Sequence, residues 1–560
     1  MPPYIPGQLQ SLPVLLAPQD AMLITVFCGL GAHIIFKIWE PMQFRLVSVL
    51  LIISPLLLST LLIPHYGVVS SILHTFSIYL TTLATSIIVY RLSPWHPLAK
   101  YPGPILAKIT KLHHALIVHT GKQHLHIKSL HEQYGDVVRI GPNEVSIRDV
   151  SCIQPLMGAQ GLPKGPGWNA RGLLRPIPTL VGIRDPAEHA RRRRPWNRAF
   201  NTNGIKEFMP AVQSRVHQLV ERLGEREGQS IDLAEWFSFF TYDFMGDMIF
   251  GGWTEMMRDG GDVKGLWHCV RDGLRAGSIP EHVPWIAYYA KKVSSVVRKA
   301  LELSYMGDSR AQQRYQQGST SKDLFYYLSN EDGSEKVSPS PAVVTSDGVL
   351  ALVAGSDTTS SVLSNLFYCL LRNPVSYKRL QEEVDKFYPP GENSLDPRHI
   401  NDMPFLEAVI NEAMRLYPVI PSGSQRSPEK GKGGKAVGQY YIPEGSQARI
   451  HFWSVFRDPR NFSHPDTFWP DRWLIIEGLQ ESPEKITHNA NAFIPFSFGP
   501  ANCVGKNIAL QEMRVAVTHL MQKLTVRFAD DFNLDEWDSQ IEDQTVMQLG
   551  KLKVVVERRD

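Results

Sequence analysis

The stretch Phe496-Ser-Phe-Gly499-Pro-Ala-Asn-Cys503-Val-Gly505-Lys506 decides how the rest of the chain is interpreted. It places Cys503 directly before a run of good helix formers, so backbone N–H groups and the positive end of the helix dipole favour a thiolate there. The glycines on either side allow the backbone to approach a flat, bulky group closely. Such a thiolate can be a nucleophile, a redox thiol or a metal ligand, and the spacing by itself leaves these roles open.

Three further segments precede this loop along the chain. They are Ala354-Gly-Ser-Asp357-Thr358-Thr359 on a predicted helix from 345 to 372, Glu412-Ala-Met-Arg415 on a predicted helix from 405 to 416, and Phe468-Trp-Pro-Asp-Arg472-Trp. Thr358 lies four residues after Ala354, so its hydroxyl can bond the Ala354 carbonyl and loosen the helix. Glu412 and Arg415 are expected to form a charge-assisted pair that Arg472 joins.

Together with the cysteine loop, these segments resemble the motifs of the cytochromes P450, the haem-thiolate monooxygenases, in that family's order and at its spacing. The resemblance extends from about Pro94 to the C-terminus. It implies a mainly α fold with small β-sheets, the cytochrome P450 fold, here preceded by N-terminal transmembrane helices.

The resemblance implies haem as the cofactor, with the Cys503 thiolate as the axial ligand of the iron. Ala501 stands where the family usually has a basic residue that neutralises a haem propionate, so that contact is in doubt. The other residues that the resemblance places at the haem are Phe496, Gly499 and Gly505 in the loop, His189 and Arg193 four residues apart in a basic run, and Arg426.

The same resemblance divides the remaining motif residues into catalytic and structural ones. Thr358 and Asp357 are expected to be catalytic, because a groove beside them would hold O2 and both side chains would deliver protons to it. Glu412, Arg415 and Arg472 are expected to support the haem loop structurally.

The composition is that of an ordinary globular protein. The chain has 560 residues, of which 43% are hydrophobic and 20% charged, and its net charge of +3 gives no argument for nucleic acid as a partner. Its five cysteines are too few and too scattered for a disulfide framework. We therefore expect one large, mainly helical domain in a thiol-reducing compartment.

The first hundred residues differ from the rest by their long uncharged runs. Residues 1–93 are predicted to be a membrane anchor with about three transmembrane helices, at 21–38, 46–63 and 67–90. Residues 94–104 are predicted to be a proline-rich hinge, and residues 105–560 the haem-thiolate catalytic domain.

The positive charges near these runs predict their orientation. Lys37, Arg45, Arg91 and Lys100 would all lie on one side of three spans. The positive-inside rule then places the N-terminus in the lumen, and the catalytic domain on the cytosolic side of a multi-pass membrane protein, expected in the endoplasmic reticulum. A cleaved signal peptide is the rival interpretation of the first run, but the basic n-region it would need is missing.

The expected function is that of a monooxygenase that inserts one oxygen atom from O2 into a lipophilic small molecule such as a terpenoid, in secondary metabolism. Electrons would come from NADPH through cytochrome P450 reductase, because the chain has no dinucleotide-binding fingerprint of its own. Lys506 and the run Arg191 to Arg194 are candidates for docking this acidic donor. The candidate pocket segments implied by the resemblance are 162–182, 347–355, 419–425 and 545–550.

Two alternatives stay open. One is a haem-thiolate isomerase or dehydratase that needs no reductase, although such members often lose the acid and threonine found here as Asp357 and Thr358. The other is a non-catalytic haem-binding or lipid-binding membrane protein.

Overall fold

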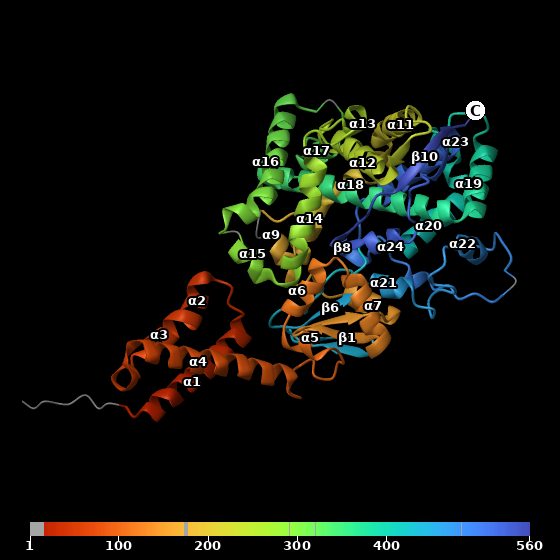
Figure 1. Cartoon of the computed structure of the whole chain (residues 1–560). Helices are drawn as coiled ribbons and strands as arrows, with labels where there is room; N and C mark the ends of the chain where they lie inside the picture. Colours follow the sequence, from red (N-terminus) through yellow and green to blue (C-terminus); the bar gives the residue numbers. More distant parts are fainter. Residues whose placement is uncertain (1–15, 173–176, 291, 320, 483, 560) are drawn as a thin grey trace, which may run out of the picture. The chain divides into compact units, whose positions relative to one another are not determined.

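The computed structural model describes residues 16–172, 177–290, 292–319, 321–482 and 484–559. The chain divides into two units, one ending at Ala99 and the other beginning at Lys100. Figure 1 shows the elements of both units in the colours of the sequence.

The apolar segments at the start of the chain are helical. The helices of this unit are α1 (Pro18–Trp39), α2 (Phe44–Ser48), α3 (Ser54–Ser59) and α4 (Ile63–Leu92), with a π-helical turn at Val49–Ile53. In the π turn, the Ser54 N–H donates to the Val49 carbonyl, five residues earlier. The next residue, Pro55, has no N–H and cannot donate a helical hydrogen bond. Within the described residues, α1 and α4 are long and apolar enough to cross a membrane, whereas 44–59 is a shorter apolar helix.

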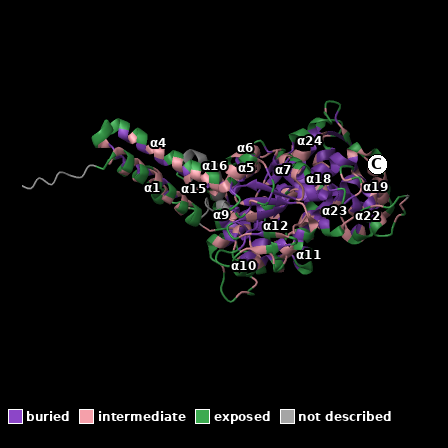
Figure 2. Cartoon of the chain, turned by 90° about the horizontal axis from the view of Figure 1, so that it is seen from below, coloured by how far each residue is buried: buried purple, intermediate pink, exposed green. Residues whose placement is uncertain are grey.

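The packing of α1 and α4 is the reverse of that in a water-soluble bundle. Large apolar side chains such as Leu23, Phe27 and Leu73 are exposed, and Figure 2 shows little buried colour along either helix. The side chains buried on these two helices are small or carry a hydroxyl, except for Leu83: Ala21, Thr25, Gly29 and Ala32 on α1, and Ser71, Thr75, Tyr79 and Leu83 on α4. Small residues at the contact and apolar residues outside are typical of helices that pack in lipid.

Helices α1 and α4 run parallel to each other. Three contacts show this, because the residue numbers increase in the same direction along both helices. They join His65 to the Leu16 carbonyl, Gly29 to Tyr79, and Lys37 to the ring of Tyr90. Residues 40–62 must therefore return the chain from the end of α1 to the level where α1 began. Tyr79 ties this returning segment to α4, because its hydroxyl donates to the Leu50 carbonyl at 2.8 Å.

The second unit is mainly α, as predicted. Residues 94–104, the predicted hinge, contain neither helix nor strand. The first helices are α5 (Ile105–Ile109), α6 (Leu112–His119), α7 (Gln123–Tyr134), α8 (Ile153–Met157), α9 (Gly167–Gly172), α10 (Pro186–Ala199), α11 (Thr202–Gly224), α12 (Leu233–Phe250), α13 (Met256–Asp259) and α14 (Leu266–His282). The later ones are α15 (Pro284–Ala290), α16 (Ser294–Gln317), α17 (Leu324–Leu328), α18 (Pro341–Arg372), α19 (Pro374–Phe387), α20 (Pro404–Leu416), α21 (Phe452–Phe456), α22 (Asp471–Ile476), α23 (Lys506–Lys523) and α24 (Glu536–Gln540).

The strands form small sheets at the margins of the helices. They are β1 (Val137–Gly141), β2 (Glu144–Ile147), β3 (Ser230–Asp232), β4 (Lys435–Val437), β5 (Tyr440–Ile442), β6 (Gln447–Ile450), β7 (Leu524–Phe528), β8 (Glu542–Gln544), β9 (Val546–Gln548) and β10 (Lys553–Arg558). One sheet has the order β1-β2-β6, with the first pair antiparallel and the second parallel, and another has the order β3-β10-β7. The two remaining pairs, β4-β5 and β8-β9, are antiparallel hairpins.

Helix α18 is the centre of the core. Its residues from Val344 to Leu370 are almost all buried, and it contacts α12, α20 and α23. Pro341 starts the helix at its first position, and Pro374, two residues after its last residue, prevents its continuation. Buried residues are concentrated around α12, α18 and α23 in Figure 2. This packing holds the two motif-bearing helices α18 and α23 against each other.

Candidate active site

Cys503 closes a tight loop just before α23. Its backbone N–H donates to the Phe496 carbonyl at 2.9 Å, and the Asn502 N–H donates to the Gly499 carbonyl at 3.0 Å. Gly499 has a φ of 73°, and a Cβ there would lie 2.1 Å from the Met157 carbonyl oxygen. Only glycine fits this position, so the loop conformation depends on it.

The sulfur of Cys503 lies on an exposed side chain beside the first turn of α23. A Cβ at Gly505 would lie 3.9 Å from the sulfur, an ordinary van der Waals distance, so contacts within the protein do not by themselves require glycine there. Desolvation raises the pKa of the Cys503 thiol, although the N–H groups of Gly505 and Lys506 and the charge of Arg193 oppose this. The helix end therefore acts in the predicted direction but is outweighed by desolvation, and a bound metal cation would supply the remaining stabilisation of a thiolate.

Arg193, on α10, holds the cysteine loop. Its guanidinium donates to the carbonyls of Pro500 and Asn502 at 3.2 and 2.6 Å, and to Asn502 Oδ1 at 2.7 Å. These contacts lie on both sides of Ala501, the position without a basic side chain. Arg193 thus ties α10 to the loop through protein contacts, and its role toward a propionate stays a prediction.

His189 and Arg426 lie in a cationic environment. Burial, followed by the charges of Lys164, Arg193 and Arg426, lowers the pKa of His189 to about 4, so its ring is neutral at neutral pH. Arg426 is buried, its Nε has no hydrogen-bond partner, and burial lowers its pKa to about 10. A buried guanidinium of this kind calls for an anion, which the propionates of the implied haem would provide.

The residues of α18 lie as the motif predicts, with one difference. The Thr358 hydroxyl donates to the Ala354 carbonyl at 2.6 Å, yet α18 remains helical throughout. Gly355 serves packing rather than distortion, because a Cβ there would lie 2.4 Å from the Met245 sulfur on α12. Ala354 is exposed and Thr358 half-exposed on a helix that is otherwise buried, so this part of α18 is left uncovered by protein.

Asp357 faces away from bulk water and has a partner that the motif did not reveal. The Tyr242 hydroxyl on α12 donates to Asp357 Oδ1 at 3.0 Å, while Oδ2 is buried without a hydrogen-bond partner. Burial raises the pKa of Asp357 to about 7, against the opposing effects of Tyr242 and the Arg271 charge. This carboxyl can therefore hold and release a proton near neutral pH.

A second buried acid joins α23 to α18. Burial raises the pKa of Glu512, on α23, well above its usual range, and the Thr359 side chain on α18 opposes this. Thr359 follows Thr358, and α23 follows Cys503, so this acid lies where the two motif-bearing helices meet. That the two motifs form one site stays a prediction.

Glu412, Arg415 and Arg472 form the predicted network, fully buried. Arg415 donates to both carboxylate oxygens of Glu412 at 2.9 and 2.8 Å, and Arg472 Nε donates to Oε1 at 3.1 Å. Two further donors were not predicted, the Trp469 N–H at 2.9 Å and the Trp473 Nε1–H at 3.0 Å. Burial opposes ionisation of Glu412, but the two arginines outweigh it and hold its pKa below the usual value.

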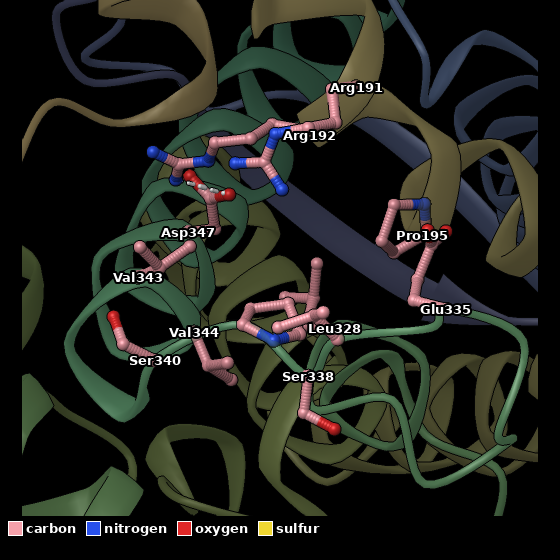
Figure 3. Close-up of a pocket in the computed structure, with 12 residues that line it drawn as sticks. Arg191, Arg192, Pro195, Leu328, Glu335, Ser338, Ser340, Val343, Val344 and Asp347 are labelled. Atoms are coloured by element: carbon pink, nitrogen blue, oxygen red, sulfur yellow. Dashed lines mark ion pairs between the residues drawn. The ribbon is translucent and has the colours of Figure 1, made fainter.

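The basic run on α10 is divided between inside and outside. Figure 3 shows Arg192 with Asp347 at a cavity of about 300 Å³ between α10 and the start of α18. Arg192 Nη2 lies 2.6 Å from Asp347 Oδ2, both side chains are buried, and Arg192 Nη1 donates to the Pro178 carbonyl at 2.8 Å. Arg192 therefore joins α10 to α18 inside the unit. Arg191 pairs with Glu188 at the surface, and Arg194 is exposed.

The chemistry of these side chains fits a haem. Among the described residues no group of three or more His, Cys, Asp or Glu side chains could hold a metal ion, so a metal here would need most of its ligands from a prosthetic group. The site offers one exposed cysteine sulfur as a metal ligand. It also offers the buried guanidinium of Arg426, whose Nε has no hydrogen-bond partner among the described residues. One axial ligand, here a thiolate, and a cation for a propionate carboxylate suit a haem b.

Comparison with known proteins agrees with this fit. The family model described as Cytochrome P450 matches residues 97–554. Cytochrome P450 monooxygenase FCK2 of Fusarium pseudograminearum is 32% identical over 483 residues, which cover 85% of each chain. Cytochrome P450 67 of Uromyces fabae is 32% identical over 91% of this chain and 94% of that protein. Cytochrome P450 monooxygenase phqL of Penicillium fellutanum is 29% identical over 100% of this chain and 99% of that protein.

Proposed function

This chain belongs to the cytochrome P450 family, and we propose that it inserts one oxygen atom from O2 into a lipophilic small molecule, with electrons from NADPH delivered by cytochrome P450 reductase. The chain is an oxidoreductase of the monooxygenase type, as its relatives are. A haem bound through a cysteine thiolate supplies the activation of O2. The residues proposed to hold it are Cys503, His189, Arg193 and Arg426, with Phe496, Gly499 and Gly505 shaping the loop.

The observation that carries the proposal is the pairing of an exposed cysteine, in the loop before α23, with an acid and a hydroxyl on α18, which packs against α23. Cys503 precedes α23, which contacts α18, and α18 presents Thr358 beside the uncovered Ala354. Asp357 has a pKa of about 7, a value suited to passing protons at neutral pH. Haem-thiolate isomerases and dehydratases often lack the acid and threonine that this chain has as Asp357 and Thr358, and a haem carrier needs neither residue, so the proposal favours the monooxygenase.

The substrate class is inferred from the four candidate pocket segments, which hydrogen bonds join to one another. The Gly165 N–H donates to the Gln425 carbonyl at 2.9 Å, and the Met547 N–H to the Val419 carbonyl at 2.8 Å. The Leu180 N–H donates to Asp347 Oδ1 on α18 at 2.8 Å. Apolar residues of these segments, namely Leu350, Val353 and Val419, are only partly buried in the core. An apolar ligand of the kind used in secondary metabolism, such as a terpenoid, would cover them.

The membrane arrangement is inferred from the N-terminal unit. Because α1 and α4 are parallel, the segment between them has to run back through the same thickness, which favours three spans over two. Lys37 and Arg91 lie at the same end of the two helices. Three spans with this end in the cytosol support a catalytic domain on the cytosolic face of the endoplasmic reticulum, where exposed Lys506 and Arg194 could meet the reductase.

The test is reconstitution. The full-length protein, purified with its haem, is incubated with a reductase, NADPH, ¹⁸O2 and a panel of lipophilic compounds, and the products are identified by mass. The proposal predicts a product that carries one ¹⁸O atom and depends on NADPH. Products that form equally well without reductase and contain no ¹⁸O would show an isomerase or dehydratase instead.

A further inference from the structure

A polar cavity leads from the surface of the catalytic unit to Asp357. Its volume is about 350 Å³, and it lies between α12, α14, α18 and the segment that follows β9. His268 and Lys551 are exposed at its rim, whereas Asp357 is buried. The cavity is separate from the four candidate pocket segments except at 547–550, so substrate binding does not explain its polar lining.

The side of α18 that lines this cavity is unusually rich in hydroxyl groups for a buried helix. Ser360, Ser361 and Ser364 lie there, and each donates to a backbone carbonyl, at 3.2, 3.0 and 2.7 Å respectively. Their oxygens remain able to accept hydrogen bonds from water. A cavity of this polarity and size has room for several waters and polar partners for them.

Asp357 is held at the inner end of the cavity by one oxygen only. Tyr242 is fully buried on α12 and donates to Asp357 Oδ1, whereas Oδ2 has no hydrogen-bond partner among the described residues. The tyrosine therefore fixes the carboxyl group and leaves its second oxygen for exchange of a proton. Nothing in the four family motifs involves Tyr242.

We propose that this cavity is the path by which solvent protons reach Asp357, and that Tyr242 is the positioning residue that orients the Asp357 carboxyl for this exchange. The inference rests on the proposed function, in which Asp357 passes a proton toward Thr358. Each proton that leaves Asp357 on that side is replaced by one from cavity water, which takes its own from bulk solvent through the waters behind it.

The charged groups around Asp357 set the pH at which this exchange fails. Burial raises the pKa of Asp357 to about 7, while the Tyr242 hydrogen bond and the charge of Arg271 on α14 oppose this. Asp232, Glu235, His268 and Lys551 line the outer part of the cavity, and Asp262 and Cys269 lie near Tyr242. Protonated Asp357 is the donor, so coupling of NADPH use to product falls as the pH rises through this pKa.

Tyr242→Phe tests the proposal in the haem-loaded, full-length protein with reductase. Loss of the hydroxyl destabilises the carboxylate and raises the pKa of Asp357, so the alkaline fall in product formed per NADPH moves up by about one to two pH units. Coupling on the acid side drops several-fold, because the carboxyl is no longer held. Asp357→Asn removes the pH-dependent fall altogether.

Tyr388→Phe is the matched control, because Tyr388 is also buried and its hydroxyl bonds only to protein outside the cavity, with the Asp396 carbonyl at 2.6 Å as its acceptor. It should leave the pH profile where it is in the wild type. If the wild type forms product but Tyr242→Phe and Tyr388→Phe have the same pH profile of coupling, the inference is overturned. Failure of the proposed function is a different result, since the wild type would then form no oxygenated product at any pH.

Discussion

Replacing Glu412 by Gln should remove a large part of the stability of the catalytic domain. The Glu412 carboxylate accepts five hydrogen bonds, from Arg415, Arg472, Trp469 and Trp473. Both arginines are fully buried, so the neutral amide leaves two cations without a compensating charge. Breaking a buried pair of this kind costs about 3–5 kcal/mol, against a total stability of about 5–15 kcal/mol.

The assay is urea unfolding of the haem-loaded protein, followed by the haem spectrum and by tryptophan fluorescence. Glu412→Gln should lower the midpoint by about 1–2 M urea. Glu407→Gln is the control, because Glu407 lies on the same helix but pairs with Arg514 near the surface, where such a pair contributes less than about 1 kcal/mol. If the two variants unfold within about 1 kcal/mol of each other, the network does not have the structural role inferred for it.

Three further results are expected. Arg426→Gln should weaken haem binding about 10–100-fold without destabilising the haem-free protein, because it removes a buried unpaired charge; equal haem affinity in a titration of the two proteins would contradict this. Thr358→Ala should keep haem and substrate binding but release more hydrogen peroxide per NADPH, and unchanged coupling would refute its role in proton delivery. A glycosylation site engineered near Gln8 should be modified, whereas one placed in the loop 330–334 should not, and the reverse pattern would overturn the three-span topology; the natural site at Asn461 is no test, because Asn461 is buried.

The parts of the site that lie close together in sequence could be predicted from it. The Thr358 bond to Ala354 and the Glu412 pair with Arg415 follow from helical spacing of four and three residues, and both are present. The predicted helices at 345–372 and 405–416 correspond to α18 and α20 with starts up to four residues earlier. Local patterns suffice here because the partners lie on one helix.

Other features depend on tertiary packing and left no local signal. Tyr242 lies 115 residues from Asp357, so only the packing of α12 on α18 reveals their contact. The same packing explains Gly355, whose missing side chain leaves room for Met245. Desolvation of the Cys503 thiol, which raises its pKa, likewise arises from the folded unit and cannot be read from the helix end alone. In the N-terminal unit, the predicted middle span at 46–63 is a shorter helix at 44–59, interrupted by the π turn before Pro55.

The spectrum of the reduced, carbon-monoxide-treated protein tests the central claim most directly, because it reports the ligand that the protein gives to the haem iron. The wild type should absorb at about 450 nm, as expected for a thiolate ligand, and Cys503→Ala should lose this band while Cys369→Ala, which changes a buried cysteine of α18, keeps it. A wild-type spectrum typical of histidine-ligated haem, or a full band in Cys503→Ala, would contradict the account.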